Sequence, residues 1–293
     1  MKFVILIHLL NWEHHENEYI LEEGISFINP NTHPVGKLYK KICERDNVDE
    51  GEPYTFNTGL ILYDETGSDH SFLPSSSHYS LSTTFINLLT IIYKGTLGHC
   101  RIIMSKDDFK TSHLTYTLYD SLTEFTDELT VYHSKFDRNS IEVLEKVWQN
   151  LKSIYTSGVQ KSRIDNMLNF FYFSWYTLTL ELTGISLSIV LETLFSPHSN
   201  SELTHQIACN VSNLMGNEKE EKKELYKYVK KYYSIRSKLV HGEAIKEVEL
   251  NLIPPFFKFI CEVILKIISD DSLIHTFNDN DQRREFIQDK LFE

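Results

Sequence analysis

Apolar residues in the second half of the chain recur at the three- and four-residue spacing of amphipathic helices. In residues 140–155, Ile141, Leu144 and Val147 follow this spacing, which matches the period of about 3.6 residues of an α-helix. Each such helix must bury its apolar stripe against a neighbour, so several in succession specify a bundle. We therefore predict an all-α helical domain over residues 136–293, a length within the usual range for one domain.

Glycine and proline residues lie mainly between these apolar runs and mark where the helices end. Ser201 is a plausible N-cap for one helix and Gly216 its stop, while Gly242 is expected at the C′ position of the longest helix. The sequence predicts helices over residues 140–155, 163–182, 185–196, 201–216 and 219–241, in a run that begins near Pro255, and over residues 281–292.

Residues 1–135 carry strand-like patterns instead of helical ones. Turn signals separate short runs rich in apolar, Thr or Tyr residues, as is typical of strands. The fold class is therefore predicted to be α+β, with a mixed N-terminal domain before the helical one. The predicted strands are residues 2–10, 58–63, 99–104 and 111–119, and a helix is expected over residues 80–94.

The overall charge and the cysteines limit the classes of function. The formal net charge is -12, so a nucleic-acid site would have to be a local basic patch. The four cysteines are far apart in the sequence, which argues against a disulfide framework or a structural zinc site and suits the reducing cytosol. No segment has the composition of a membrane span or the cleavage pattern of a signal peptide, so we expect a cytoplasmic protein that uses no membrane.

An arginine occupies the apolar face of the helix expected over residues 219–241. On a helical wheel, Val229 and Tyr232 belong to one apolar stripe, and Arg236 lies in the middle of it. A buried charge is rare unless it is paired. Arg236 should therefore face either an acid or a cleft that receives an anion, and Glu192, inside the apolar run SIVLETLF, is a candidate partner.

His241 is the last residue before the glycine that closes this helix. The partial negative charge of a helix C-terminus favours the protonated imidazole, and a histidine that titrates near neutrality can serve as general acid or base. On an ideal helix, Arg236 and His241 point about 140° apart. Either the helix end is distorted, then, or a second copy of the helix completes a shared site. On spacing alone, a capping histidine and a structural arginine remain the alternative.

Three stretches, in this order and spacing, resemble the Apea-like branch of the HEPN superfamily. They are LETLFSP, ELTHQIACNVSNLMG and LYKYVKKYYSIRSKLVHGE, and the closing RREFIQDKLF is similar to that branch's C-terminal helix. The resemblance covers residues 137–293. The R-x(4–6)-H motif of the family corresponds here to Arg236 and His241, its acid to Glu192, and the polar residue after its arginine to Ser237.

The resemblance implies an α-helical domain that dimerises and forms a composite site at the dimer interface. Active members are metal-independent ribonucleases, often found in antiphage defence, toxin and abortive-infection systems. In that chemistry the ribose 2′-hydroxyl attacks the adjacent phosphorus, His241 moves the proton, and Arg236 stabilises charge in the transition state. Glu192 would orient Arg236, whereas Ser237 cannot act as a base at neutral pH. No cofactor is implied, and the expected partners are RNA, a second copy of the chain and a component of a defence system.

Lysines along the same helix predict an RNA-binding surface. Residues 222–238 are strongly basic, and tyrosines that could stack on bases lie between the lysines. The alternative is that the lysines form only the solvated face of an amphipathic helix, with the tyrosines in the core or in a dimer seam. The candidate RNA-binding residues are Lys223, Lys227, Lys230 and Lys238, and the tyrosines are Tyr226, Tyr228, Tyr232 and Tyr233.

No chemistry can be assigned to the N-terminal domain. The histidines and glutamates of residues 13–16 lack the spacing that places two metal ligands on one helical face. Its position alone suggests a sensor or regulatory module. For the whole chain, the first hypothesis is a HEPN endoribonuclease, and the alternative is a non-catalytic HEPN module that binds RNA or a protein partner.

Overall fold

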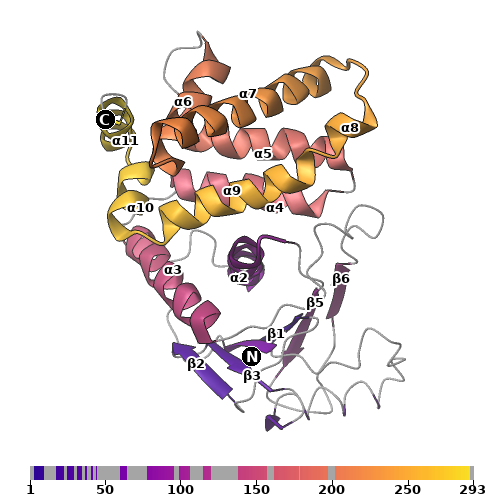
Figure 1. The fold of residues 1–293 in the computed structure, drawn as a ribbon. Coiled ribbons are helices and arrows are strands. Elements are labelled where there is room, and N and C mark those ends of the chain that lie inside the picture. The colour runs from indigo at the N-terminus through magenta and orange to yellow at the C-terminus, as the bar shows by residue number, and fades with distance from the viewer. Residues whose placement is uncertain are drawn as a thin grey trace. The chain divides into compact units, whose positions relative to one another are not determined.

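The computed structural model describes the chain in segments that hold most of the predicted elements. The chain divides into two compact units, and most of their helices and strands are labelled in Figure 1. The first unit comprises residues 1–89, 96–123 and 130–145, and the second comprises residues 90–95, 124–129 and 146–293. The described residues are 3–9, 18–22, 25–29, 32–34, 37, 41, 44, 60–64, 78–95, 99–105, 115–119, 138–156, 162–177, 179–196 and 202–290.

The first unit contains a six-stranded sheet with the strand order β2-β3-β4-β1-β5-β6. Each pair of neighbouring strands is antiparallel. In the middle of β1, Leu6 lies opposite Leu62 of β4 and Ile102 of β5. The strands are β1 (Phe3–Leu9), β2 (Glu18–Glu22), β3 (Ile25–Ile28), β4 (Leu60–Asp64), β5 (His99–Ser105) and β6 (Thr115–Tyr119). The four predicted strands are therefore confirmed as β1, β4, β5 and β6.

The strands β2 and β3 were not predicted from the sequence. β3 is only four residues long and is buried along its whole length, including the polar Ser26. A strand this short and buried on both faces lacks the alternation of apolar and polar residues by which a strand is recognised. Its partner β2 carries a register shift between Ile20 and Glu22, which also disturbs the pattern. The predicted helix of this region is confirmed as α2 (His78–Tyr93).

The described part of the second unit consists of helices, and α3 begins in the first unit. Helices therefore dominate the C-terminal half, and the chain as a whole is an α+β protein. The helices are α3 (Arg138–Thr156), α4 (Arg163–Tyr176), α5 (Leu180–Phe195), α6 (Leu203–Met215), α7 (Lys219–His241), α8 (Glu247–Leu250), α9 (Ile253–Ile268), α10 (Asp271–Asn278) and α11 (Asn280–Asp289).

Two boundaries predicted from the sequence are wrong. The apolar run over residues 163–182 does not form one helix, because α4 ends and α5 begins within it, with the Thr179 side chain as the N-cap of α5. A threonine hydroxyl offers the backbone a hydrogen bond that competes with helix continuation. The N-cap of α6 is Glu202, which has a left-handed φ of 56° and makes no side-chain cap. Ser201, the predicted cap, lies outside the described residues.

Helix α9 supplies much of the apolar core of the second unit. Phe257 stacks on Phe171 of α4, with 5.5 Å between ring centroids, and Phe256 stacks on Tyr232 of α7 at 3.4 Å. The prolines at the start of α9 suit a first helical turn, where a backbone N–H is not needed. Among the described helices, none combines the length and the apolar composition that crossing a bilayer would require.

Gly184 allows α5 to lie close to α7 and α9. A Cβ atom at this position would be 3.1 Å from Ile253 Cδ1, 3.2 Å from Leu239 Cδ1 and 3.3 Å from the Tyr232 hydroxyl oxygen. The Tyr232 hydroxyl donates a hydrogen bond to the Gly184 carbonyl. The distance between α5 and α7 therefore depends on the missing side chain.

Substitution of Gly184 by a side chain larger than that of alanine should destabilise the protein. In Gly184→Ala, a gain in helix propensity of about 1 kcal/mol offsets small shifts of the neighbouring side-chain tips. Gly184→Val adds branches that those tips cannot all avoid, and overpacking of this kind costs about 1–3 kcal/mol. Free energies of unfolding in urea would compare the two variants with the wild type. Equal stability of the two variants would show that the helices are not in tight contact here.

Candidate functional site

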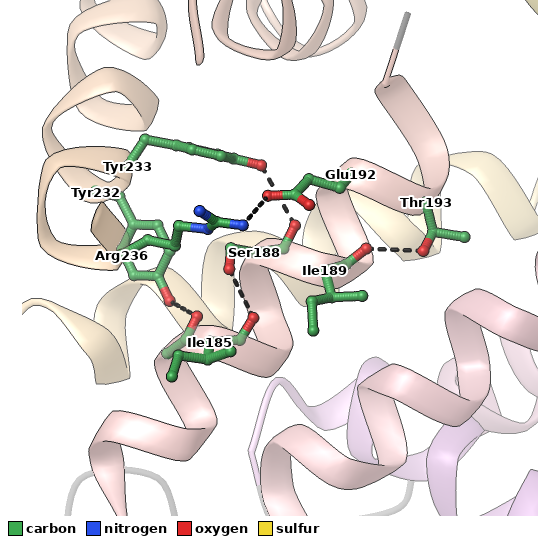
Figure 2. Close-up of polar contacts among 9 residues, drawn as sticks. Ile185, Ser188, Ile189, Glu192, Thr193, Tyr232, Tyr233 and Arg236 are labelled. Atoms are coloured by element: carbon green, nitrogen blue, oxygen red, sulfur yellow. Dashed lines mark hydrogen bonds and ion pairs between the residues drawn. The ribbon is translucent and has the colours of Figure 1, made fainter. Parts of the chain in front are cut away.

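An ion pair joins α7 to α5 at the arginine that the sequence places on an apolar face. Arg236 Nη2 lies 3.1 Å from Glu192 Oε1. Figure 2 shows the guanidinium extended from α7 toward the carboxylate on α5. The two side chains retain 28% and 22% of their exposure, so the pair is partly buried rather than enclosed. The predicted pairing of Arg236 with Glu192 is therefore confirmed.

One face of α5 receives polar side chains from α7 at intervals of four residues, the spacing of neighbouring positions on a helix surface. Two tyrosine hydroxyls donate hydrogen bonds to backbone carbonyls, and the arginine meets a carboxylate one turn further along (Figure 2). Packing of the tyrosines thus sets where the guanidinium lies. The contacts run from Tyr232 to Gly184, from Tyr233 to Ser188 and from Arg236 to Glu192.

Burial opposes the ionisation of Glu192 more strongly than Arg236 favours it. Removal from water raises the pKa of the Glu192 carboxyl above its ordinary value, although the positive charge of Arg236 acts in the opposite direction. Arg236 Nε is also buried and has no hydrogen-bond partner among the described residues. The guanidinium therefore keeps donor capacity beyond its contact with the carboxylate.

The stability of the wild type relative to Glu192→Gln should fall as the pH rises. Folding raises the pKa of Glu192, so the folded protein favours the protonated carboxyl. The contribution of Glu192 to the free energy of unfolding is fully present below pH 4.5, the ordinary pKa of a glutamate. It is lost as the pH rises through the raised pKa of the folded protein. Urea unfolding of both proteins, from about pH 4 to about pH 8, measures this difference. The opposite slope would mean that attraction to Arg236 outweighs the effect of burial.

His241 is the last residue of α7 and lies exposed at the helix end. Gly242 follows with a left-handed φ of 69°. The N–H groups of Gly242 and Glu243 donate to the carbonyls of Leu239 and Lys238, the double closure of a Schellman motif. The predicted C′ glycine is therefore confirmed. Within the described part of the chain, His241 has no hydrogen-bond or ion-pair partner, so its imidazole is open to solvent.

Helix α7 is α-helical without interruption from Lys219 to His241. Arg236 and His241 therefore point about 140° apart and lie about 7.5 Å apart along the helix axis. Of the two alternatives that the sequence left open, distortion of the helix end does not occur, and contribution from a second copy stays a prediction. Ser237, which follows the arginine, is exposed.

Three of the four lysines predicted to bind RNA are paired with glutamates. The pairs within α7 are well exposed, so they are weak and a phosphate could compete with the carboxylates. The local excess of positive charge is nevertheless smaller than the lysines alone suggest, and RNA binding stays a prediction. The pairs are Lys223–Glu220 at 2.6 Å, Lys227–Glu224 at 2.7 Å and Lys238–Glu249 at 2.6 Å, while Lys230 Nζ lies 5.7 Å from the Tyr226 ring centroid.

Two of the four tyrosines that could have stacked on bases are buried. Tyr232 and Tyr233 are 3% and 4% exposed, so the base-stacking interpretation is wrong for both. Tyr228 packs edge-on or tilted against two phenylalanines of α9. The Tyr226 hydroxyl lies 2.9 Å from His205 Nδ1 on α6. The tyrosines of α7 therefore mainly serve packing between helices.

Glu249 holds the segment that follows His241, and sequence reasoning missed it. One of its carboxylate oxygens pairs with Lys238, and the other accepts a hydrogen bond from the Lys246 backbone N–H. The hydrogen bond from Lys238, followed by that from Lys246, lowers the pKa of Glu249. Glu249 stands three positions after the N-cap residue Lys246, as in a capping box, but a lysine is not a recognisable N-cap, so the usual sequence signal was absent.

Comparison of the chain with protein-family models, with curated proteins and with solved structures finds no match. The described residues contain no group of three or more His, Cys, Asp or Glu side chains placed to hold a metal ion. The similarity to HEPN domains therefore rests on the quoted sequence motifs, and the function is a matter for proposal.

Proposed function

We propose that the helical unit is a HEPN-type endoribonuclease that cuts RNA without a metal ion. The observation that carries this proposal is the Arg236–Glu192 ion pair, a partly exposed guanidinium held at 3.1 Å by a carboxylate. The same helix ends in the exposed His241. A guanidinium fork suits phosphate oxygens, and an imidazole can move protons near neutral pH. These are the two groups that metal-free transesterification of RNA needs.

In the proposed reaction, the ribose 2′-oxygen forms a bond to the adjacent phosphorus while the bond from phosphorus to the 5′-oxygen breaks. His241 takes the proton from the 2′-hydroxyl, and the resulting imidazolium gives a proton to the leaving 5′-oxygen. Arg236 stabilises the negative charge that builds up on the phosphoryl oxygens. The products are a 2′,3′-cyclic phosphate and a 5′-hydroxyl end.

In this proposal, a second copy of the chain completes the site, because it places a histidine beside the arginine of the first copy. Arg236 and His241 diverge on one continuous helix, so one copy does not direct both at one phosphate. Two α7 helices related by a two-fold axis could bring the arginine of one copy beside the histidine of the other. In this proposal, Glu192, which lies 3.1 Å from Arg236, keeps the guanidinium extended toward that shared position.

Substitution of His241 should abolish RNA cleavage without unfolding the protein. Purified wild type, incubated with total cellular RNA in EDTA, is expected to leave cyclic-phosphate ends, and His241→Ala should cut about 100-fold more slowly or worse, as for loss of a general acid or base. A matched control is His275→Ala, which removes another partly exposed histidine on α10. Equal cutting by wild type and His241→Ala would place the activity elsewhere.

Mixing two inactive variants should restore part of the activity if the site is shared between copies. Arg236→Met and His241→Ala each disable both sites of their own dimer. Random exchange of subunits makes about half of the dimers mixed. One of the two sites in a mixed dimer is intact, so about a quarter of the wild-type activity should return. Activity that stays at the level of the separate variants would contradict the shared site. Native mass measured on the same samples reports the dimer independently.

A non-catalytic role is the second candidate, and one observation favours it. Glutamates pair with Arg236 and with three of the four candidate lysines, as expected of a surface shaped for structure or for a protein partner. In that case the helical unit would bind RNA or a defence component without cutting. The place of the protein in antiphage defence, its cytoplasmic location and a sensing role for residues 1–135 belong to the same proposal.

A further inference from the structure

The C-terminal end of α5 is held by side chains from other helices. The last carbonyls of a helix lack an intrahelical donor, and here Pro197, which has no backbone N–H, follows the helix. Four successive carbonyls accept hydrogen bonds from residues of α4, α6 and α11. The contacts run from Arg163 to Thr193, from Arg283 to Leu194, from Asn210 to Phe195 and from Arg283 to Ser196.

Arg283 of α11 makes the most costly of these contacts. Its side chain is almost fully buried at 2% exposure, and its Nη1 lies 3.1 Å from both the Leu194 and the Ser196 oxygens. Burial, and then the charges of Arg163 and Arg284, lowers the pKa of Arg283 to about 10. No carboxylate pairs with Arg283 among the described residues. The negative end of the α5 dipole is therefore what favours its charge.

We propose that Arg283 is a positioning residue for the Glu192–Arg236 pair and acts through the end of α5, an inference that rests on the proposed function. The contacts form a continuous chain. Arg283 donates to the Ser196 carbonyl, and the Ser196 N–H donates to the Glu192 carbonyl at 2.9 Å. The Glu192 carboxylate then meets Arg236. Arg283 thus fixes the last turn of α5, from which the carboxylate projects.

In the proposed cleavage reaction, the rate depends on where the Glu192 carboxylate holds the Arg236 guanidinium. A group that stabilises charge in a transition state loses much of its effect when it is displaced by about 1 Å. Among the described residues, Glu192 is the ion-pair partner of Arg236, at a single contact. If the last turn of α5 frays, Glu192 moves and the guanidinium loses its direction. Arg163 and Asn210 donate to the carbonyls of Thr193 and Phe195, whereas Arg283 donates to the carbonyl of Ser196, the residue whose N–H closes this turn on the Glu192 carbonyl.

The test compares three substitutions on α11 in the full-length protein. Arg283→Met removes the hydrogen bonds and keeps an unbranched apolar stem, and Arg283→Lys keeps the charge but not the planar fork. Arg284→Met is the matched control, because Arg284 is the next residue, half-exposed and 3.9 Å from Asp281. For each protein, kcat and KM for RNA cleavage are measured. The exchange of the Arg236 Hε proton with water is followed by NMR, a readout that needs no activity.

Arg283→Met should lower kcat roughly tenfold with little change in KM, the signature of a contact that matters only in the transition state. The Arg236 Hε proton should exchange roughly tenfold faster with water, because its buried nitrogen becomes exposed when α5 frays. Arg283→Lys should recover part of both effects. Arg284→Met should match the wild type in both measurements.

An Arg283→Met protein that unfolds more readily but keeps wild-type kcat and Hε exchange would overturn the inference, since Arg283 would then only cap a helix. If Arg283→Met does not fold, Arg283→Lys takes its place in the test. Wild-type kcat and a wild-type exchange rate of the Arg236 Hε proton in Arg283→Lys would then overturn the inference. If the wild type cuts no RNA, the proposed function fails, and the exchange rate alone then decides whether Arg283 positions Arg236.

Discussion

A helix that ends before a proline must find donors for its last carbonyls outside its own backbone, and α5 is that helix in this protein. Two arginines and an asparagine from three other helices supply those donors. The same helix receives the tyrosines and the arginine of α7 on the face that Gly184 leaves open. The end of α5 therefore links these helices, and Glu192, the acid of the candidate site, lies in its last turn.

Two charged side chains near the end of α5, Glu192 and Arg283, lie where burial disfavours their charged forms. The pKa of Glu192 is raised and the pKa of Arg283 is lowered, in both cases chiefly by removal from water. Each group is retained with partners that recover only part of that cost, a carboxylate–guanidinium contact for Glu192 and helix-end carbonyls for Arg283. A hydrophobic residue at position 283 would leave two carbonyls at the end of α5 without these donors, so the cost of burying Arg283 is offset by the backbone groups that it satisfies.

The sequence predicted features that depend on local patterns and missed those that depend on distant partners. The apolar run of β1 and the closure of α7 at Gly242 follow from neighbouring residues, and both were predicted correctly. Arg236 and Glu192 could be matched because each is a charge of opposite sign within an apolar run. Arg283 lies in a polar segment, and its partners are backbone carbonyls nearly ninety residues away. No pattern of side chains marks such a contact in advance.

The buried tyrosines of α7 provide an absorbance signal for the unfolding of the protein. Burial, more than any neighbouring charge, raises the pKa of Tyr232 and of Tyr233 well above the ordinary value. Both phenols therefore stay neutral in alkaline solution while the fold is intact, and they ionise when α7 leaves α5. The phenolate absorbance of these two residues would therefore appear together with unfolding. In alkali, this ultraviolet absorbance would record the separation of the two helices that carry the candidate site.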